Sequence, residues 1–284
     1  MIFQRHPATL VLLCAAILLS CARDGSRGSA LVATSIYPVA DIARNVAGDA
    51  AGVMHAVPAS ANPHSFEPDP STVKQLHGAA LYIGVHPELD GWVAKLLSPE
   101  AKRLFIADSM GGENPHYWLS VRKAKQIAGL VRDLLSSSFP EKKETFAENC
   151  ATYQKKLDAL DGRIAALFTP LRNKKFIQWH PAWDFFAADY GLTIAGTIES
   201  GHGDSPSLKG FRALADTARR EKIAVVVVDQ YVQGGTAAAL VREIGGREVR
   251  LDSIGGHSEP GKSDYIGMME QNARILAGAL AGAR

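Results

Sequence analysis

Short apolar segments alternate with amphipathic ones from Leu31 to the C-terminus, and this alternation is the sequence feature that most constrains the fold. The apolar segments are rich in branched residues and read as strands at 31–36, 52–57, 81–85, 103–107, 175–179, 193–198, 224–229 and 248–252. Most of them are followed by a helical pattern, which is typical of parallel strands joined by helices that cover the sheet. We therefore predict an α/β protein with two lobes, each a mostly parallel four-stranded sheet flanked by helices.

The stretch 140–171 between the two groups of strands is predicted to be one long helix. Pro140 suits its first turn, and acidic residues follow there. Its apolar residues recur every three or four positions, as one buried face requires: Phe146, Cys150, Tyr153, Leu157, Leu160, Ile164, Leu167 and Leu171. A coiled-coil seam is the alternative, but the outer face lacks regular charge pairing. We therefore predict lobes at 31–139 and 172–284, joined by a rigid helix that spans roughly 45 Å and restricts hinge motion.

Residues 1–20 are predicted to be a signal peptide. Arg5 supplies a positive charge, and the apolar stretch 8–19 has the length of a signal-peptide core but is short for a spanning helix. The sequence LLSC at 18–21 is similar to the cleavage box of bacterial lipoproteins; an ordinary signal peptide with a chance Cys is the alternative. On the first interpretation Cys21 carries lipid and residues 21–30 form a flexible tether. The protein would then be exported and anchored to a membrane, facing the periplasm or the cell exterior.

Charge and cysteine content argue against a nucleic-acid-binding protein and against a fold held by intramolecular disulfides. The chain has 31 Lys and Arg against 29 Asp and Glu, without a basic stripe, which argues against nucleic-acid binding. Cys14 and Cys21 belong to the N-terminal signal, so Cys150 is left without a partner for an intramolecular disulfide. Its place on the apolar face of the predicted helix indicates a buried structural thiol.

Three of the nine histidines are the strongest candidate metal ligands. His64 and His116 each follow an Asn-Pro pair in a loop, and His180 follows a strand. Ligands of open α/β sheets bind beyond the carboxyl ends of the strands, and Pro makes the approach to each His rigid. Asp252, at the end of the last strand, is a fourth candidate, and three imidazoles with one carboxylate suit a divalent transition ion. From spacing alone, a structural role for each His remains the alternative.

The other histidines are weaker candidates. His77 lies in a helical pattern and His55 in a strand, so both are expected to be structural. His86 opens a loop after a strand, and His202 and His257 lie in Gly-rich loops, where they would be surface or cleft-rim residues.

Three residues are candidates for supporting the metal ligands from outside. Such an imidazole needs its other N–H bound by a carboxylate, a carbonyl group or water. Glu67, three residues after His64, and Asp229, at the end of a strand, are possible holders, and Trp118 could keep water away from the ion.

Five segments occur in order from about Leu31 onward: ATSIYPVADIARNVAGD, NPHSFEPDPSTVKQLHGAALYIGVHPELDGWVAKLL, NPHYWLSVRKAKQIAGLV, WHPAWDFFAADYGL and VRLDSIGG. Together they resemble the zinc/manganese class (cluster A-I, or cluster 9) of metal solute-binding lipoproteins that serve ABC importers. The resemblance implies two α/β lobes joined by one long helix, with an ion buried at their interface. It also implies metal ligands at His64, His116, His180 and Asp252.

The function that this resemblance implies is that of a receptor and not of an enzyme. It would capture a divalent metal outside the cytoplasmic membrane, as a monomer, and deliver it to the ABC permease. Manganese-type members tend to carry a carboxylate where His180 stands, and nitrogen-rich sites suit zinc. We therefore expect Zn²⁺. The His-rich loop of many zinc-specific relatives is missing, since 93–115 contains no His, so Mn²⁺ and Fe²⁺ stay open.

Two other functions are alternatives to a metal receptor. A metallohydrolase would need an open metal position for water, and the sequence contains no HExxH motif, nucleophile elbow or phosphate-cradling loop. A surface adhesin is suggested only by the family resemblance, and no residue selects for it.

Overall fold

The computed structural model describes residues 30–282 apart from 60, 200–205, 231, 233–234 and 258–262. The predicted signal peptide, Cys21, nearly all of the predicted tether and His202 therefore lie outside the described residues. In the described ranges, no helix combines the length and the apolar character that crossing a bilayer requires.

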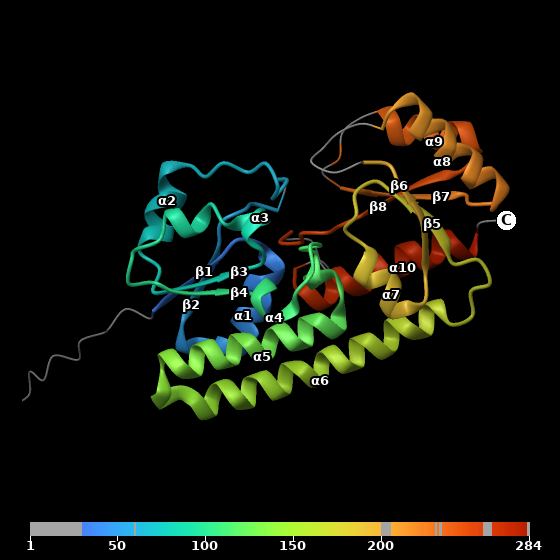
Figure 1. The fold of residues 1–284 in the computed structure, drawn as a ribbon. Coiled ribbons are helices and arrows are strands. Elements are labelled where there is room, and N and C mark those ends of the chain that lie inside the picture. The colour runs from blue at the N-terminus through green and yellow to red at the C-terminus, as the bar shows by residue number, and fades with distance from the viewer. Residues whose placement is uncertain are drawn as a thin grey trace, which may run out of the picture.

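In the part of the chain that the structure describes, eight short strands form two parallel four-stranded sheets that lie side by side in Figure 1. The strands of the first sheet are β1 (Leu31–Thr34), β2 (Gly52–His55), β3 (Leu81–Gly84) and β4 (Lys102–Phe105). Those of the second are β5 (Lys175–Gln178), β6 (Thr193–Thr197), β7 (Val225–Asp229) and β8 (Arg247–Leu251). The orders β2-β1-β3-β4 and β6-β5-β7-β8 are the same topology used twice, although the sequence contains no recognisable repeat. The predicted α/β fold with two parallel sheets is confirmed.

Helices connect the strands and cover both faces of each sheet. Those around the first sheet are α1 (Tyr37–Ala47), α2 (Pro70–His77), α3 (Pro87–Asp90), α4 (Ala107–Met110) and α5 (Val121–Ser138). Those around the second sheet are α7 (Asp184–Tyr190), α8 (Leu208–Arg220), α9 (Gly235–Ile244) and α10 (Tyr265–Ala281). Short 3₁₀ turns lie at Gly48–Ala50, Val93–Lys95, Tyr117–Leu119 and Pro140–Lys142.

Alternation along the strands divides each lobe into layers. In β7, Val225 and Val227 face the core that is shared with the long helices, whereas Val226 and Val228 face a separate cluster with α8 and α9. This alternation follows from the two-residue period of a strand. Because both faces are covered by apolar groups, the strand reads as an uninterrupted run of valines.

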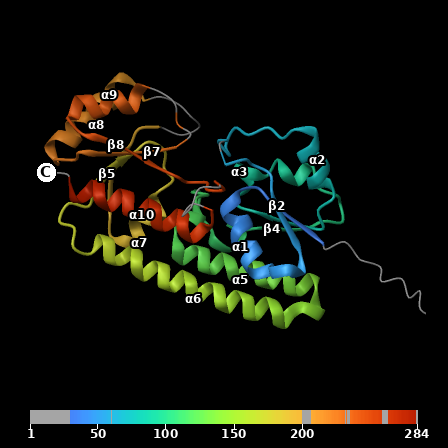
Figure 2. The same cartoon turned by 180° about the vertical axis from the view of Figure 1, so that it is seen from behind.

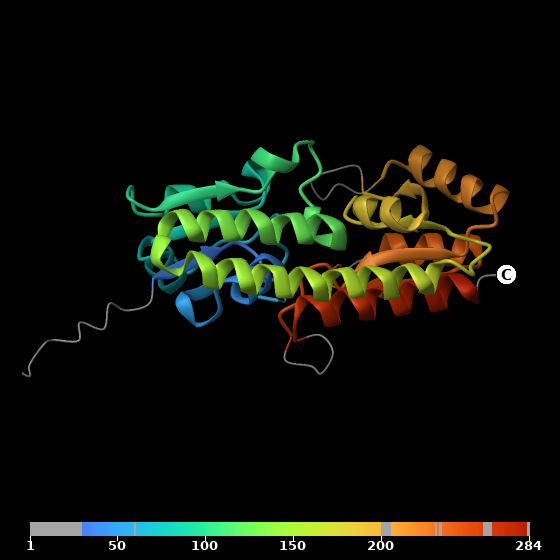
Figure 3. The same cartoon turned by 90° about the horizontal axis from the view of Figure 1, so that it is seen from below.

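The long helix α6 (Lys143–Phe168) runs under both lobes, as Figure 3 shows from below. Its 26 residues correspond to about 39 Å. It packs against α5, α1 and α10, and Figure 2 shows α1 and α10 between the sheets and this helix pair. One continuous core therefore extends beneath both sheets and fixes the two lobes on a common support.

The C-terminal end of α6 differs from the prediction. The buried face continues from Ile164 to Phe168, whereas Leu167 is half-buried and Leu171 lies beyond the end of the helix. Pro170 explains the early end, since Pro has no N–H with which to continue the ladder of helical hydrogen bonds. The helix begins at Lys143, after the 3₁₀ turn that contains Pro140.

Buried hydrogen bonds join the lobes next to their shared support. The Tyr265 hydroxyl donates to the Trp118 carbonyl at 2.7 Å, and the Trp118 Nε1–H donates to the Ser253 carbonyl at 2.6 Å. The backbone N–H of Tyr265 donates to Asp41 Oδ2 at 3.1 Å. These bonds fix how the two halves face each other beside the cavity described below.

Candidate metal centre

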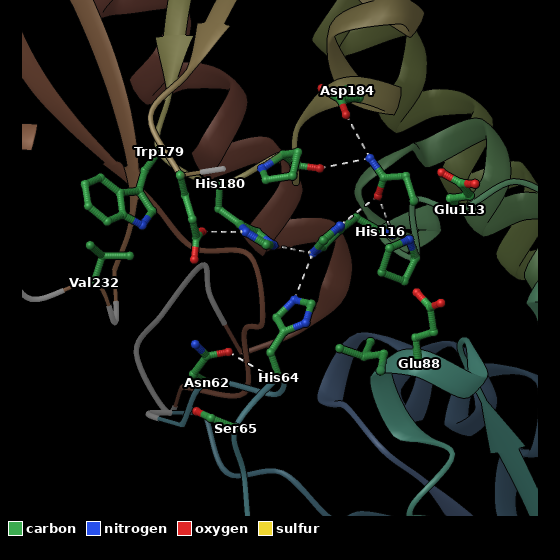
Figure 4. A pocket seen from close by; sticks show the side chains of 15 residues that line it. Asn62, His64, Ser65, Glu88, Glu113, His116, Trp179, His180, Asp184 and Val232 are labelled. Carbon is green, nitrogen blue, oxygen red and sulfur yellow. Dashed lines mark hydrogen bonds and ion pairs between the residues drawn. The ribbon is translucent and has the colours of Figure 1, made fainter. Parts of the chain in front are cut away.

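A cavity of about 720 Å³ lies between the two lobes, lined by residues of both. Figure 4 shows three of its histidines pointing toward one another. His64 comes from the loop between β2 and α2, His116 from the loop after α4, and His180 lies two residues beyond β5. These segments follow strands β2, β4 and β5, the second of them after the short helix α4, so all three histidines lie beyond the carboxyl ends of parallel strands, where open α/β sheets form their binding sites.

Local sequence sets the approach of the first two histidines. Asn62 Oδ1 accepts a hydrogen bond from the His64 backbone N–H at 2.9 Å, and Asn114 Oδ1 accepts one from the His116 N–H at 3.0 Å. In both motifs a Pro with fixed φ stands between the Asn and the His. Each Asn-Pro-His motif is therefore a closed turn that presents one imidazole to the cavity.

The three imidazoles converge through their Nε2 atoms. The Nε2 of His116 lies 3.4 Å from that of His64 and 3.1 Å from that of His180. One ligand atom from each residue falls within 4.8 Å of the other two. Nitrogens at Zn–N bond lengths around a tetrahedral ion are about 3.3 Å apart. The spacing of the donor atoms therefore fits a single ion, and all three donors are nitrogen, which suits zinc.

Burial keeps the central imidazole neutral. His116 is 3% exposed, and loss of water contact lowers its pKa well below the usual 6.5, with His180 and His64 contributing in the same direction. Metal binding requires an unprotonated imidazole nitrogen. His116 is thus already in the protonation state that a ligand needs at neutral pH.

Two residues that the sequence analysis did not identify hold the outer nitrogens of these rings. Glu199 Oε2 lies 2.8 Å from His180 Nδ1, and Asn114 Oδ1 lies 2.8 Å from His116 Nδ1. A carboxylate in this position orients a ligating imidazole and makes it more basic. Both residues carried a signal, because Glu199 follows β6, the neighbour of β5, and Asn114 belongs to the Asn-Pro-His motif.

Asp252 lies just beyond β8 and is 7% exposed. Its carboxylate oxygens are not within 4.8 Å of all three histidine ligand atoms. Its Oδ1 accepts hydrogen bonds from Gln230 Nε2 at 2.8 Å and from the backbone N–H groups of Ile254 and Gly255 at 3.0 and 2.7 Å. Its Oδ2 lies 3.5 Å from His257 Nε2. One oxygen is thus fixed by the loop, while the other faces a histidine.

The comparison with known proteins assigns the family. The family described as "Zinc-uptake complex component A periplasmic" (ZnuA) matches residues 32–279, nearly the whole described range. The chain belongs to the ZnuA family.

Individual relatives of this ZnuA-family chain agree with the assignment. It is 29% identical to the zinc-binding lipoprotein AdcA of Streptococcus pneumoniae serotype 4 over 94% of its own length and 59% of that protein's. It is 24% identical to the high-affinity zinc uptake system protein ZnuA of Bacillus subtilis, over 94% and 95% of the two chains. A crystal structure of ZnuA superimposes with a TM-score of 0.80 at 25% identity, covering 89% of this chain and 99% of that one. The chain thus spans about three fifths of the streptococcal relative and nearly all of the Bacillus one.

The three supporting residues predicted from the sequence of this ZnuA-family chain lie in different environments. Trp118 is buried, and its ring centroid lies 5.1 Å from that of His116. Asp229 is buried at the end of β7, and its carboxyl group interacts electrostatically with His180, Glu199 and Asp252. Glu67 is exposed and is not among the residues that line the cavity.

The described histidines outside the cluster have separate surroundings. His55, the last residue of β2, packs edge-on against Tyr37 of α1. His77 is exposed at the end of α2. His86 caps α3, its Nδ1 accepting from the Glu88 N–H at 3.2 Å. His257 contacts Asp252 and Gln230, so it is closer to the candidate ligands than a rim position implies.

Proposed function

We propose that this protein is the extracytoplasmic metal receptor of an ABC importer, which captures a zinc ion between its two lobes and delivers it to the permease. The observation that carries the proposal is the convergence of three imidazole Nε2 atoms at the spacing of ligands around one ion. These donors come from both lobes, so a bound ion would hold the lobes together. Membership of a family named for zinc uptake supports the same function.

The proposed ligands are His64, His116, His180 and Asp252. The first three form the nitrogen cluster, and the carboxylate is included because its position matches the family pattern. Asp252 Oδ2 makes no hydrogen bond within the described ranges, which leaves this oxygen available for a cation. Ligation by Asp252 would require a change at this loop, because the carboxylate lies outside the nitrogen cluster.

Zinc is the proposed cargo, and Mn²⁺ or Fe²⁺ are its competitors. Three imidazoles with one carboxylate form a nitrogen-rich set, whereas manganese favours oxygen donors. The Streptococcus pneumoniae and Bacillus subtilis relatives carry zinc in their names, which supports the same choice.

Export and partners complete the proposal. Relatives described as periplasmic or as a lipoprotein support an exported protein, and we propose that Cys21 carries the lipid anchor. The family is named for a component of an uptake complex, which supports a binding protein and not an enzyme. We further propose a monomer, with lobes at 31–139 and 172–284 joined by the 140–171 segment.

Metal-stripped protein tests the proposal by calorimetric titration with zinc, followed by competition with manganese. We expect one zinc ion per chain, bound more tightly than manganese. His64→Ala and His180→Ala should each weaken zinc binding by at least tenfold, because each removes a nitrogen donor. His77→Ala is the matched control, since His77 is exposed at the end of α2 and lies outside the cluster. Unchanged zinc affinity in both cluster variants would refute the site.

A further inference from the structure

The side-chain amide of Asn114 contacts both lobes beside the histidine cluster. Its Oδ1 lies 3.0 Å from the His116 backbone nitrogen and 2.8 Å from His116 Nδ1. Its Nδ2 lies 2.9 Å from the Pro181 carbonyl oxygen and 2.9 Å from Asp184 Oδ2. All the hydrogen-bonding atoms of one amide group are thus engaged around two of the candidate ligand loops.

These neighbours allow only one orientation of the amide. The Pro181 carbonyl and the Asp184 carboxylate only accept hydrogen bonds, so the NH₂ group of Asn114 must face them. A flipped amide would place its oxygen against two acceptors and its NH₂ group against the N–H of His116. Asp184 is itself held in place, because its Oδ1 accepts from Gln178 Nε2 at 2.9 Å. Residues of the C-terminal half therefore set the orientation of Asn114.

The orientation of Asn114 in turn selects the tautomer of His116. The amide oxygen only accepts, so the short contact at 2.8 Å requires a hydrogen on His116 Nδ1. A neutral imidazole carries one ring hydrogen, and the Nε2 then holds an exposed lone pair. That Nε2 is the atom that faces the Nε2 atoms of His64 and His180.

We propose that Asn114 is a positioning residue that holds His116 in the Nδ1–H tautomer, so that its Nε2 is ready to accept a metal ion. The tautomer follows from the contacts of Asn114, whereas its consequence for zinc rests on the proposed function. Without Asn114, the imidazole could place its hydrogen on Nε2, and zinc binding would first have to shift it.

The chain offers a matched control in its other Asn-Pro-His motif. Asn62 Oδ1 accepts from the backbone N–H of His64 at 2.9 Å, as Asn114 does from that of His116. Asn62→Ala therefore removes the same kind of turn without touching the bond to His116 Nδ1.

The test uses metal-free protein labelled with ¹⁵N-histidine, in which long-range ¹⁵N–¹H spectra distinguish protonated from unprotonated ring nitrogens. His116→Gln identifies the His116 signals by their loss. We expect the wild type and Asn62→Ala to show hydrogen on Nδ1, and Asn114→Ala to show a mixture of both tautomers. Calorimetry should give zinc binding that is weaker by about tenfold to a hundredfold in Asn114→Ala, the usual cost of losing such a partner.

The outcomes separate this inference from the function on which it rests. A single Nδ1–H tautomer in Asn114→Ala would overturn it. A wild type that binds no zinc would instead defeat the proposed function while leaving the tautomer assignment intact. Zinc affinity within twofold of wild type in a folded Asn114→Ala protein would overturn the consequence for metal binding.

Discussion

The buried carboxyl group of Asp229 leads to a quantitative prediction for the metal-free protein. Asp229 ends β7, is 1% exposed, and its Oδ1 has no hydrogen-bond partner within the described ranges. Burial raises its pKa from 3.8 to about 6, and the negative charges of Glu199 and Asp252 act in the same direction. We therefore expect Asp229→Asn to change how stability depends on pH.

The size of the effect follows from the pKa difference between folded and unfolded protein. At about 1.4 kcal/mol for each pKa unit, the rise from 3.8 to about 6 means that ionised Asp229 costs the folded state about 3 kcal/mol. Because the folded-state pKa is the higher one, the stability linked to protonation is present below about pH 4 and is lost as pH rises through 6. Wild type should lose about 2 to 3 kcal/mol relative to Asp229→Asn between pH 4 and 7.5.

Urea unfolding of both metal-free proteins at several pH values measures this difference. Asn brings its own pH-independent cost, since its amide also lacks a partner at the Oδ1 position. That cost cancels when the stability difference between the two proteins at pH 7.5 is compared with the difference at pH 4. Asp108→Asn, at an exposed position in α4, is the control and should shift both values equally.

A stability difference that stays the same from pH 4 to 7.5 would refute the reasoning. It would mean that Asp229 titrates alike in folded and unfolded protein, through water or a compensating charge at the end of β7. A difference of the opposite sign would indicate that the ionised carboxylate stabilises the fold.

The remaining predictions concern the carboxylate that holds His180, the acid sensitivity of binding and the long helix. Glu199→Gln should weaken zinc binding by about tenfold, because it removes the charge that makes the His180 imidazole more basic. Calorimetry measures the zinc affinity, and a value equal to that of wild type would contradict this prediction. Zinc affinity should fall by about tenfold or more between pH 7.5 and 5.5, since the imidazoles must be neutral to bind. The lowered pKa of buried His116 keeps that ring neutral to lower pH. Competition titrations that show no change of zinc affinity with pH would contradict imidazole ligation. Phe168→Ala should cost about 3 to 5 kcal/mol in urea unfolding and Leu167→Ala clearly less, because only Phe168 is fully buried; equal losses would mean that both side chains support the core.

Much of the fold could be predicted from the sequence because it is specified by local patterns. The run of valines in β7 predicts a strand from residue type alone. All eight described strands begin and end within two residues of the predicted bounds. The apolar spacing in α6 likewise predicts a helix. Near its end, however, Leu167 and Phe168 both fit an apolar face, and packing of Phe168 against aromatic rings of α7 in the second lobe determined which one is buried.

The site was predictable to the extent that its residues carry local signals. Each Asn-Pro-His motif describes a turn that presents an imidazole, and His180 follows a strand. The contacts of Asn114 with Pro181 and Asp184 join residues about 70 positions apart, and no local pattern encodes them. The same is true of the bond between Glu199 and His180, which requires β6 to lie beside β5.

By itself, the sequence determined which segments become strands and helices and which side chains can donate to a metal, since both depend on residue type and short-range spacing. Tertiary structure alone decided which donors meet. His64, His116 and His180 converge because the two sheets share one core along α6, while loop hydrogen bonds hold Asp252 outside that cluster. Distances between atoms far apart in the chain are the product of the whole packed structure, and no single segment contains them.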